Sequence, residues 1–301
     1  MPLPAYRGRF APSPTGPLHA GSLLAALGSW LLARQAGGEW LLRIEDVDPP
    51  REIADAADRQ RAALAAFGLH HDGPVVYQSR RGRMYQEALD RLLANELAFE
   101  CYCSRSDLIA SGGIHRYCVA GAQRPDPAIR LRVSDGCEIG FDDLVHGHVV
   151  QRVDAEVGDF VLRRADGLWA YQLAVVVDDA AQGITDVVRG ADLLDSTPRQ
   201  ILLQRALDLP TPGYAHLPLL LDTDGRKLSK SSASMPVDPA DPLPGLRACW
   251  SSLGQSALPA SIESPADFLT AATEAFRIDR VPRSALPASA AAHNTDATSR
   301  R

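Results

Sequence analysis

The chain has 301 residues, 46% hydrophobic and 23% charged, which suffices for a buried core in one large domain or two modest ones. No stretch approaches the ~18 uninterrupted apolar residues of a membrane span, and the first residues lack the layout of a secretory signal, so we expect a soluble, cytoplasmic chain with reduced cysteines rather than a disulfide scaffold. A formal charge of −6 argues against a protein that coats nucleic acid by bulk attraction, although a local basic patch would survive that average.

A strand, a proline-rich loop, a helix and a second strand are predicted in the first part of the chain. The short segment 6–10 precedes a loop, 11–17, whose three prolines exclude helix and central strand. Leucines recur at helical spacing over 18–34 until two glycines stop the run, and 40–44 is predicted to be a strand. This order predicts a βαβ unit that opens a parallel α/β sheet.

The pattern changes in the middle of the chain. Residues 52–67 and 80–97 are predicted amphipathic helices. The following segment, 99–164, contains turn-rich stretches and short alternating runs such as 129–133 and 148–153. We therefore expect a mostly β insertion there.

The α/β pattern resumes after this insertion, with an apolar run at 169–177, a strand candidate at 184–188, a helix at 196–207 and a strand at 217–221. The last 18 residues have almost nothing large to bury, so we expect a disordered tail. We expect one α/β catalytic domain in two halves, 1–98 and 165–240, separated by the insertion at 99–164. A short helical segment at 241–283 and the tail at 284–301 follow.

Only two of the 31 basic residues are lysines, and both lie in Lys227-Leu228-Ser229-Lys230-Ser231. A GC-rich genome explains the arginine background but not these two exceptions. A compact ammonium group acts as a point charge on phosphate in a way that a planar guanidinium does not. The two lysines therefore indicate a phosphate-binding loop.

A second candidate phosphate site lies at the start of the first helix, in His19-Ala20-Gly21-Ser22. Free backbone amides and the positive end of the helix dipole favour anions there. Gly21 would let an adenine ring or ribose lie against the backbone, and His19 could donate to phosphate oxygens. Taken alone, an ordinary proline-capped helix with a surface histidine explains the segment better.

Together and in this order, the two motifs resemble the His-Ile-Gly-His and Lys-Met-Ser-Lys-Ser signatures of the class I aminoacyl-tRNA synthetases, with departures at Ser22 and Leu228. The segments around them resemble the glutamyl-tRNA synthetase catalytic domain, namely 9–16, 42–48, 169–174 and 187–193. The resemblance covers roughly residues 5–240. It implies a class I Rossmann-type parallel sheet interrupted by a zinc-bearing, mostly β insertion.

The same resemblance implies a glutamate site, since two carboxylates and one ammonium call for guanidinium groups, an acidic partner and a hydroxyl. In the family the amino acid is held at the positions of Arg9, Phe10, Ala11, Pro12, Ser13, Glu45, Tyr171 and Arg189. ATP, with Mg²⁺, is implied at His19, Gly21, Lys227 and Lys230. The catalytic residues implied are His19 and Lys230.

Cysteines at the start of the insertion are candidate zinc ligands. By spacing alone Cys101 and Cys103 form a tight half-site, and zinc is favoured no more than a purely structural role. The family pattern continues with Gly-Gly-x-Tyr and a final cysteine, here Cys118, and His115 stands where that tyrosine is expected. Because imidazole is the better zinc ligand, we expect one structural zinc with His115 as fourth ligand and Tyr117 as the alternative.

A glutamyl-tRNA synthetase continues beyond its lysine motif into a large helical domain that reads the anticodon, and only 70 residues follow Ser231. The chain therefore resembles the truncated paralogues of that enzyme. They activate glutamate with ATP to glutamyl-adenylate without tRNA and transfer it to the queuosine base in the anticodon of tRNA(Asp). The expected partners are ATP, L-glutamate and queuosine-containing tRNA(Asp), with the protein a monomer.

Three alternatives stay open from the sequence. A discriminating or non-discriminating glutamyl-tRNA synthetase would charge the tRNA 3′ end. A nucleotidyltransferase of the same superfamily would share the His-x-Gly element without the glutamate-binding set. A zinc-dependent RNA-binding protein with a decayed active site would have no need of the intact lysine pair.

Overall fold

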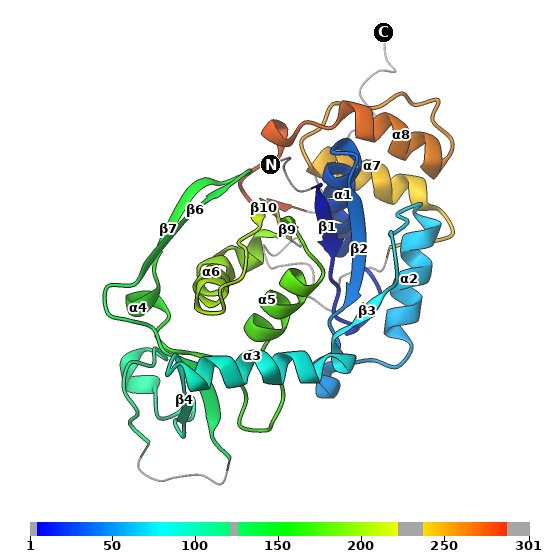
Figure 1. Cartoon of the computed structure of the whole chain (residues 1–301). Coiled ribbons are helices and arrows are strands. Elements are labelled where there is room, and N and C mark those ends of the chain that lie inside the picture. Colours follow the sequence, from blue (N-terminus) through cyan, green and yellow to red (C-terminus); the bar gives the residue numbers. More distant parts are fainter. Residues whose placement is uncertain (1–4, 121–125, 222–236, 288–301) are drawn as a thin grey trace.

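In the computed structural model, which describes residues 5–120, 126–221 and 237–287, seven strands form two mainly parallel groups that meet near the middle of the molecule (Figure 1). Of these seven, only strand β7 (Gly147–Arg152) runs antiparallel to its neighbour, at the edge. One group has the order β1 (Arg7–Phe10), β2 (Glu39–Ile44), β3 (Val76–Tyr77). The other has the order β9 (Asp186–Gly190), β10 (Gly213–Leu217), β6 (Glu138–Asp143), β7. The groups meet where β1 lies beside β9, and Thr185 N donates to Arg7 O at 3.0 Å. The predicted parallel α/β sheet is confirmed.

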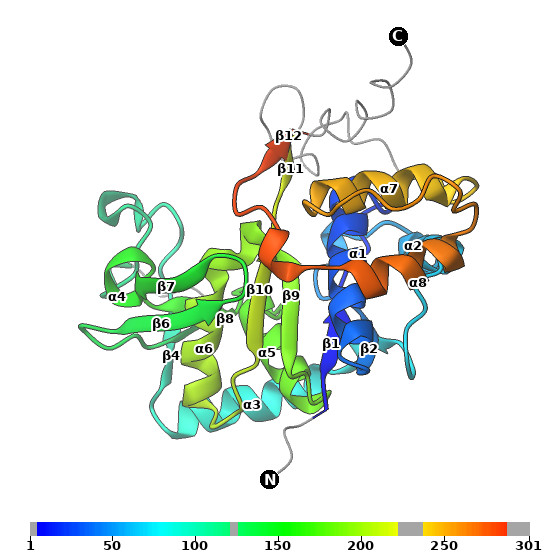
Figure 2. The ribbon, with the colours of Figure 1, turned by 90° about the horizontal axis from the view of Figure 1, so that it is seen from above.

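Helices cover both faces of this sheet because alternate residues of its strands point to opposite sides. Trp40 and Leu42 of β2 enter one core, whereas Leu41 packs against the other, and Ala215 and Tyr214 of β10 divide in the same way. The first core packs against α1 (Ala20–Gln35), α2 (Ala56–Ala66), α7 (Pro242–Ser252) and α8 (Pro265–Ala275). The second packs against α3 (Gly82–Ala94), α5 (Tyr171–Ala181) and α6 (Thr197–Ala206) (Figure 2). In the described ranges no helix is long and apolar enough to cross a membrane.

The turn between α1 and β2 follows from the two glycines predicted to stop the helix. Gly37 has a left-handed φ of +62°, which favours glycine. At Gly38 a Cβ would lie 2.2 Å from Tyr6 O, so only glycine lets the chain pass this close to the start of β1. The parallel pairing of β1 with β2 begins directly after this contact, at Arg7 and Glu39.

The segment predicted as a mostly β insertion contains strands of two sheets. Its own antiparallel sheet has the order β4-β5-β8 (Ala98–Cys101, Ala128–Leu131, Phe160–Arg163). The hairpin β6–β7 instead joins the central sheet, because β6 pairs in parallel with β10 at Asp143 and Tyr214. Short helical turns complete the described chain at α4 (Val153–Glu156), η1 (Pro49–Arg51), η2 (Gln78–Arg80), η3 (Ile109–Ser111), η4 (Ala191–Ser196) and η6 (Ile278–Arg280).

Two sequence predictions near the C-terminus are wrong. The strand predicted at 217–221 is split, because β10 ends at Leu217 and Pro218 has no N–H to continue a ladder. Its second part, β11 (Leu220–Leu221), pairs with β12 (Leu286–Pro287), so the tail predicted as disordered from 284 is ordered at least as far as this strand. Leu286 N donates to Leu219 O at 2.8 Å, and the rest of the tail lies outside the described residues.

Candidate active site

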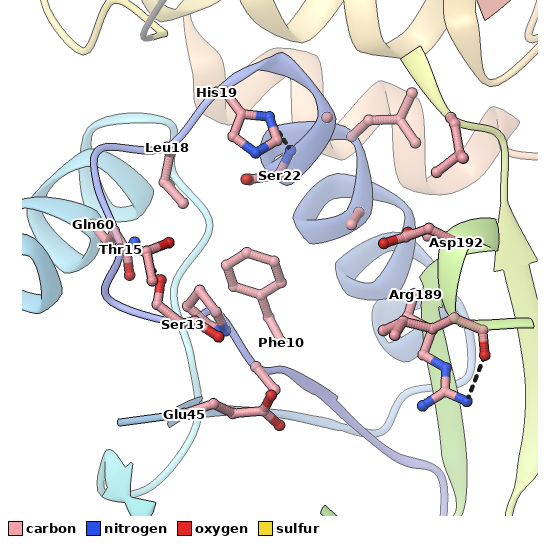
Figure 3. Close-up of a pocket in the computed structure, with 18 of the residues that line it drawn as sticks. Phe10, Ser13, Thr15, Leu18, His19, Ser22, Glu45, Gln60, Arg189 and Asp192 are labelled. Atoms are coloured by element: carbon pink, nitrogen blue, oxygen red, sulfur yellow. Dashed lines mark hydrogen bonds between the residues drawn. The ribbon is translucent and has the colours of Figure 1, made fainter. Parts of the chain in front are cut away.

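A cavity of about 510 Å³ opens at the carboxyl ends of β1, β2, β9 and β10 (Figure 3). This edge of a parallel sheet is where open α/β folds bind ligands. The structure brings to this cavity every residue that the sequence assigned to glutamate or ATP in its described part, namely Arg9, Phe10, Ala11, Pro12, Ser13, His19, Gly21, Glu45, Tyr171 and Arg189. The lysine motif, with Lys227 and Lys230, lies outside the described residues.

His19 is the N-cap of α1, with extended backbone angles of φ −117° and ψ 170°. Its Nδ1 accepts a hydrogen bond from Ser22 N at 3.3 Å, so the proton of a neutral ring sits on Nε2. A Cβ on Gly21 would lie 3.1 Å from the His19 ring, and the glycine therefore leaves the ring room in this cap. The helix start thus presents backbone amides and an N–H of His19 as donors for an anion.

A buried charge cluster that the sequence did not reveal holds Arg9 at the cavity. Arg9 Nε and Nη2 donate to the two oxygens of Asp179 at 3.1 and 3.4 Å. Arg43 Nη1 donates to the same carboxylate at 2.7 Å, and all three side chains are buried. Burial opposes ionisation of Asp179, but the two guanidinium groups outweigh it and lower the pKa of Asp179. Arg9 is therefore fixed by a protein carboxylate.

Glu45 follows β2 and faces the same cavity (Figure 3). It accepts from Arg43 Nη2 at 3.3 Å. Burial raises the pKa of Glu45, although the positive charges of Arg43 and Arg9 counteract that effect. A ligand ammonium beside this carboxylate would favour its charged form.

Arg189, on β9, has a different environment. It donates to His216 Nε2 at 3.1 Å, to Thr197 Oγ1 at 2.8 Å, and to Tyr171 Oη and Leu193 O at 3.3 Å. Its exposed fraction is 5%, and in the ranges that the structure describes no carboxylate lies within ion-pair distance of its guanidinium. A buried cation without an anionic neighbour is costly, so the site is suited to a ligand that brings a carboxylate.

The four predicted metal ligands also come together, with the donor atoms of Cys101, Cys103, His115 and Cys118 within 4.8 Å of one another. His115 Nε2 lies 3.3 Å from Cys101 Sγ and 3.7 Å from Cys118 Sγ. Tetrahedral zinc with ordinary Zn–S and Zn–N lengths requires such edges to be about 3.5 Å, so the residues fit the ion. The alternative ligand, Tyr117, is 77% exposed.

The chemistry of the thiols supports the same interpretation. Cys118 is an exposed residue, but its thiol is partly buried. This burial is the largest cause that raises the pKa of the thiol to about 11, and the neighbouring Cys101 and Cys103 raise it further. Three thiolates this close repel one another, and a divalent cation removes that repulsion. The cluster can therefore hold a metal such as zinc with four protein ligands and no open position.

Asp159 should control how well this cluster binds zinc. Its Oδ2 accepts from His115 Nδ1 at 2.9 Å and its Oδ1 accepts from Val133 N at 2.7 Å. In Asp159→Asn the amide oxygen would keep the backbone bond, so the amide NH₂ would face Nδ1 and move the ring proton to Nε2. We expect zinc affinity to fall about 10- to 100-fold, measured by competition with a chromogenic chelator. The exposed carboxylate Asp135 gives the matched control Asp135→Asn, whose affinity should equal that of the wild type; equal losses in both variants would contradict the role of Asp159.

A parallel sheet with a ligand cavity at its carboxyl edge is common to many nucleotide-binding α/β domains, and the comparisons with known proteins define the class to which this one belongs. Residues 5–126 and 118–241 match the family described as tRNA synthetases class I (E and Q), catalytic domain. The chain is 64% identical over 282 residues to a glutamyl-Q tRNA(Asp) synthetase of Xanthomonas campestris pv. campestris (strain 8004), covering 92% of this chain and 94% of the relative. It is 53% identical to the protein of the same name from Burkholderia cenocepacia (strain HI2424), over 83% and 89%. The chain belongs to the glutamyl-Q tRNA(Asp) synthetase family.

Solved structures of related class I synthetases have the same fold. A glutamate tRNA ligase from Elizabethkingia meningosepticum, crystallised with its amino acid, superposes with a TM-score of 0.78 at 27% identity. The match covers 95% of this chain and 68% of the ligase. A glutamate-tRNA synthetase from Elizabethkingia anophelis gives a TM-score of 0.77, also at 27% identity, over 94% and 68%. The likeness extends over nearly the whole of this chain.

Proposed function

We propose that this protein activates L-glutamate with ATP, without tRNA, and transfers it to the queuosine base of tRNA(Asp). The observation that carries the proposal is the cavity, which combines three features: a buried arginine with no carboxylate partner among the described residues, an opposing carboxylate and a helix N-terminus. Arg189 and His19 lie at opposite sides of this cavity (Figure 3). The names of the relatives support the same substrates.

The geometry suggests how glutamate is oriented. Its α-carboxylate must reach the α-phosphorus of ATP near His19, so the carboxylate at Arg189 is the side-chain one. Tyr171 supplies a hydroxyl beside Arg189, and Glu45 supplies the charge that pairs with the α-ammonium. A substrate with a neutral amide in place of the side-chain carboxylate would leave Arg189 without an anion.

Activation then needs positioning and charge stabilisation rather than a general base, because the attacking carboxylate is already ionised. One oxygen of the α-carboxylate attacks the α-phosphorus, the bond to the β-phosphate oxygen breaks, and pyrophosphate leaves. His19 donates from Nε2, the α1 amides bind phosphate oxygens, and Lys230 adds a positive charge. Mg²⁺ bound with ATP would neutralise part of the phosphate charge.

In the second step a hydroxyl of the cyclopentenediol of queuosine attacks the carbonyl carbon of the mixed anhydride. An ester forms, AMP leaves, and the hydroxyl proton is released. Zinc held by Cys101, Cys103, His115 and Cys118 would have a structural role, since four protein ligands leave no position for substrate.

The test is glutamate-dependent exchange between pyrophosphate and ATP with no tRNA present, followed by transfer of labelled glutamate. We expect exchange without tRNA, and labelling of tRNA(Asp) from cells that make queuosine but not from cells that lack it. Removing the 3′-terminal adenosine should leave the labelling unchanged. Lys230→Ala is the control, expected to lower exchange while glutamate still binds. Charging of the 3′ end of tRNA(Glu) would identify an ordinary glutamyl-tRNA synthetase and overturn the proposal.

A further inference from the structure

A buried carboxylate–imidazole pair lies behind the substrate arginine. Asp143 ends β6, His216 lies on β10, and His216 Nδ1 is 2.6 Å from Asp143 Oδ2. Both side chains are fully buried. Asp143 Oδ1 also accepts from Val145 N and His146 N, each at 2.9 Å. The carboxylate is therefore fixed by the backbone and aimed at the imidazole.

The direction of these hydrogen bonds determines the histidine tautomer. A carboxylate only accepts, so His216 Nδ1 carries the proton and Nε2 presents a lone pair. That lone pair accepts from Arg189 Nε at 3.1 Å, and Thr197 Oγ1 lies 3.2 Å from the same nitrogen. Burial lowers the pKa of His216, which favours the neutral ring that this arrangement needs.

Arg189 is thereby held along one edge of its guanidinium. Nε donates to His216, and Nη2 donates to Thr197 and to the carbonyl of Leu193. Nη1, which donates to Tyr171, is the nitrogen whose second N–H has no partner among the described residues. The protein therefore fixes the plane of the guanidinium and leaves the Nη1 edge for a ligand.

We propose that Asp143 and His216 are positioning residues that orient Arg189 toward the side-chain carboxylate of the substrate. Asp143 fixes the tautomer of His216, and His216 fixes Nε of Arg189. The inference rests on the proposed binding of glutamate by Arg189. It assigns to a strand of the 99–164 segment a part in amino-acid recognition.

Asp143→Asn is the sharpest test because it keeps the size of the side chain. The amide oxygen would take the backbone bonds of Val145 and His146, so the amide NH₂ would face His216 Nδ1 and move the ring proton to Nε2. Two N–H groups would then oppose each other between His216 and Arg189, as happens when the buried aspartate of a serine-protease triad is replaced by asparagine. We expect the glutamate KM in tRNA-free exchange to rise about 10- to 100-fold, with the ATP KM unchanged.

The ¹⁵N chemical shifts of the His216 ring report which nitrogen carries the proton, and a merely structural role would not change them. We expect the proton on Nδ1 in the wild type and on Nε2 in Asp143→Asn. Tyr214→Phe is the matched control on the same strand, because it keeps the ring that packs against His216 and the Arg189 guanidinium and removes only a hydroxyl that accepts from Gln204 Nε2. Its glutamate KM should equal that of the wild type. If Asp143→Asn does not fold, His216→Gln, which keeps an acceptor near Nε2, should fold and raise the glutamate KM less than His216→Leu does.

Arg189→Ala separates the two proposals. An unchanged glutamate KM in Arg189→Ala would refute the assignment of Arg189 itself. A raised KM in Arg189→Ala with an unchanged KM in Asp143→Asn and His216→Leu would refute the positioning pair alone. Equal rises in the KM of glutamate and ATP in the Asp143 and His216 variants would also refute it, because they would indicate a general loss of structure.

Discussion

Replacing Arg189 with alanine should raise the glutamate KM by about two to three orders of magnitude, with little change in the ATP KM. The guanidinium is buried, has no carboxylate partner in the described part of the chain, and borders the cavity. Loss of a buried charge-assisted pair typically costs about 2–5 kcal/mol of binding. Steady-state pyrophosphate exchange without tRNA, with each substrate varied in turn, measures the effect.

Substrate choice should change in the same variant. The wild type should bind glutamate far better than glutamine, whereas in Arg189→Ala the affinities for the two amino acids should become nearly equal, because the charge that distinguishes them is gone. Arg189→Lys should be intermediate, since an ammonium keeps the charge but cannot make the bonds of a planar fork. Arg7→Ala, which changes a half-exposed arginine outside the cavity, is the control. Equal losses of glutamate and glutamine binding in Arg189→Ala would contradict the assignment.

Replacing Asp179 with asparagine should destabilise the fold by about 3–5 kcal/mol, because Arg9 and Arg43 would both stay buried without their shared carboxylate. Denaturant unfolding at neutral pH measures the loss. The surface variant Asp166→Asn, which breaks only an exposed pair with Arg164, should cost no more than about 1 kcal/mol. A loss at Asp179 as small as that at Asp166 would show that the cluster adds little to stability.

The same carboxylate predicts a pH dependence. The pKa of Asp179 is lower in the folded chain than its ordinary value, because the two arginines outweigh the effect of burial. Its stabilisation is therefore complete above the ordinary carboxyl pKa of about 4 and is lost as the pH falls through the lower folded value. Asp179→Asn should lack this part of the acid limb. Wild-type and variant unfolding curves that keep a constant separation down to acid pH would contradict the prediction.

The sequence predicted the parts of the fold that depend on local patterns. Leucine spacing and the paired glycines identified the first helix and its end, and the prolines identified the loop that lines the cavity. Motif resemblance identified the residues at the cavity, and the structure adds that they lie together. The prediction of one strand at 217–221 was wrong because Pro218 divides an otherwise continuous apolar run.

The supporting residues could not be found in this way, because their partners are remote in sequence. Arg9 and Asp179 are 170 positions apart, and Asp143 and His216 are 73 apart. One signal was present: Asp178 and Asp179 interrupt the apolar run that forms α5, and acidic residues at buried helix positions require cationic or donor partners. No local pattern says which arginine supplies them.

Strand β6 has a consequence for how such enzymes can be recombined. It belongs by sequence to the segment that carries the four candidate metal ligands, yet it joins the central sheet beside β10 and contributes the carboxylate behind Arg189. With Arg189 in its proposed role, a chimaera that exchanges residues 99–164 with those of a relative should exchange part of the amino-acid selectivity along with the candidate metal ligands. Grafts that aim to alter the candidate metal site alone should leave Glu138–Asp143 in place.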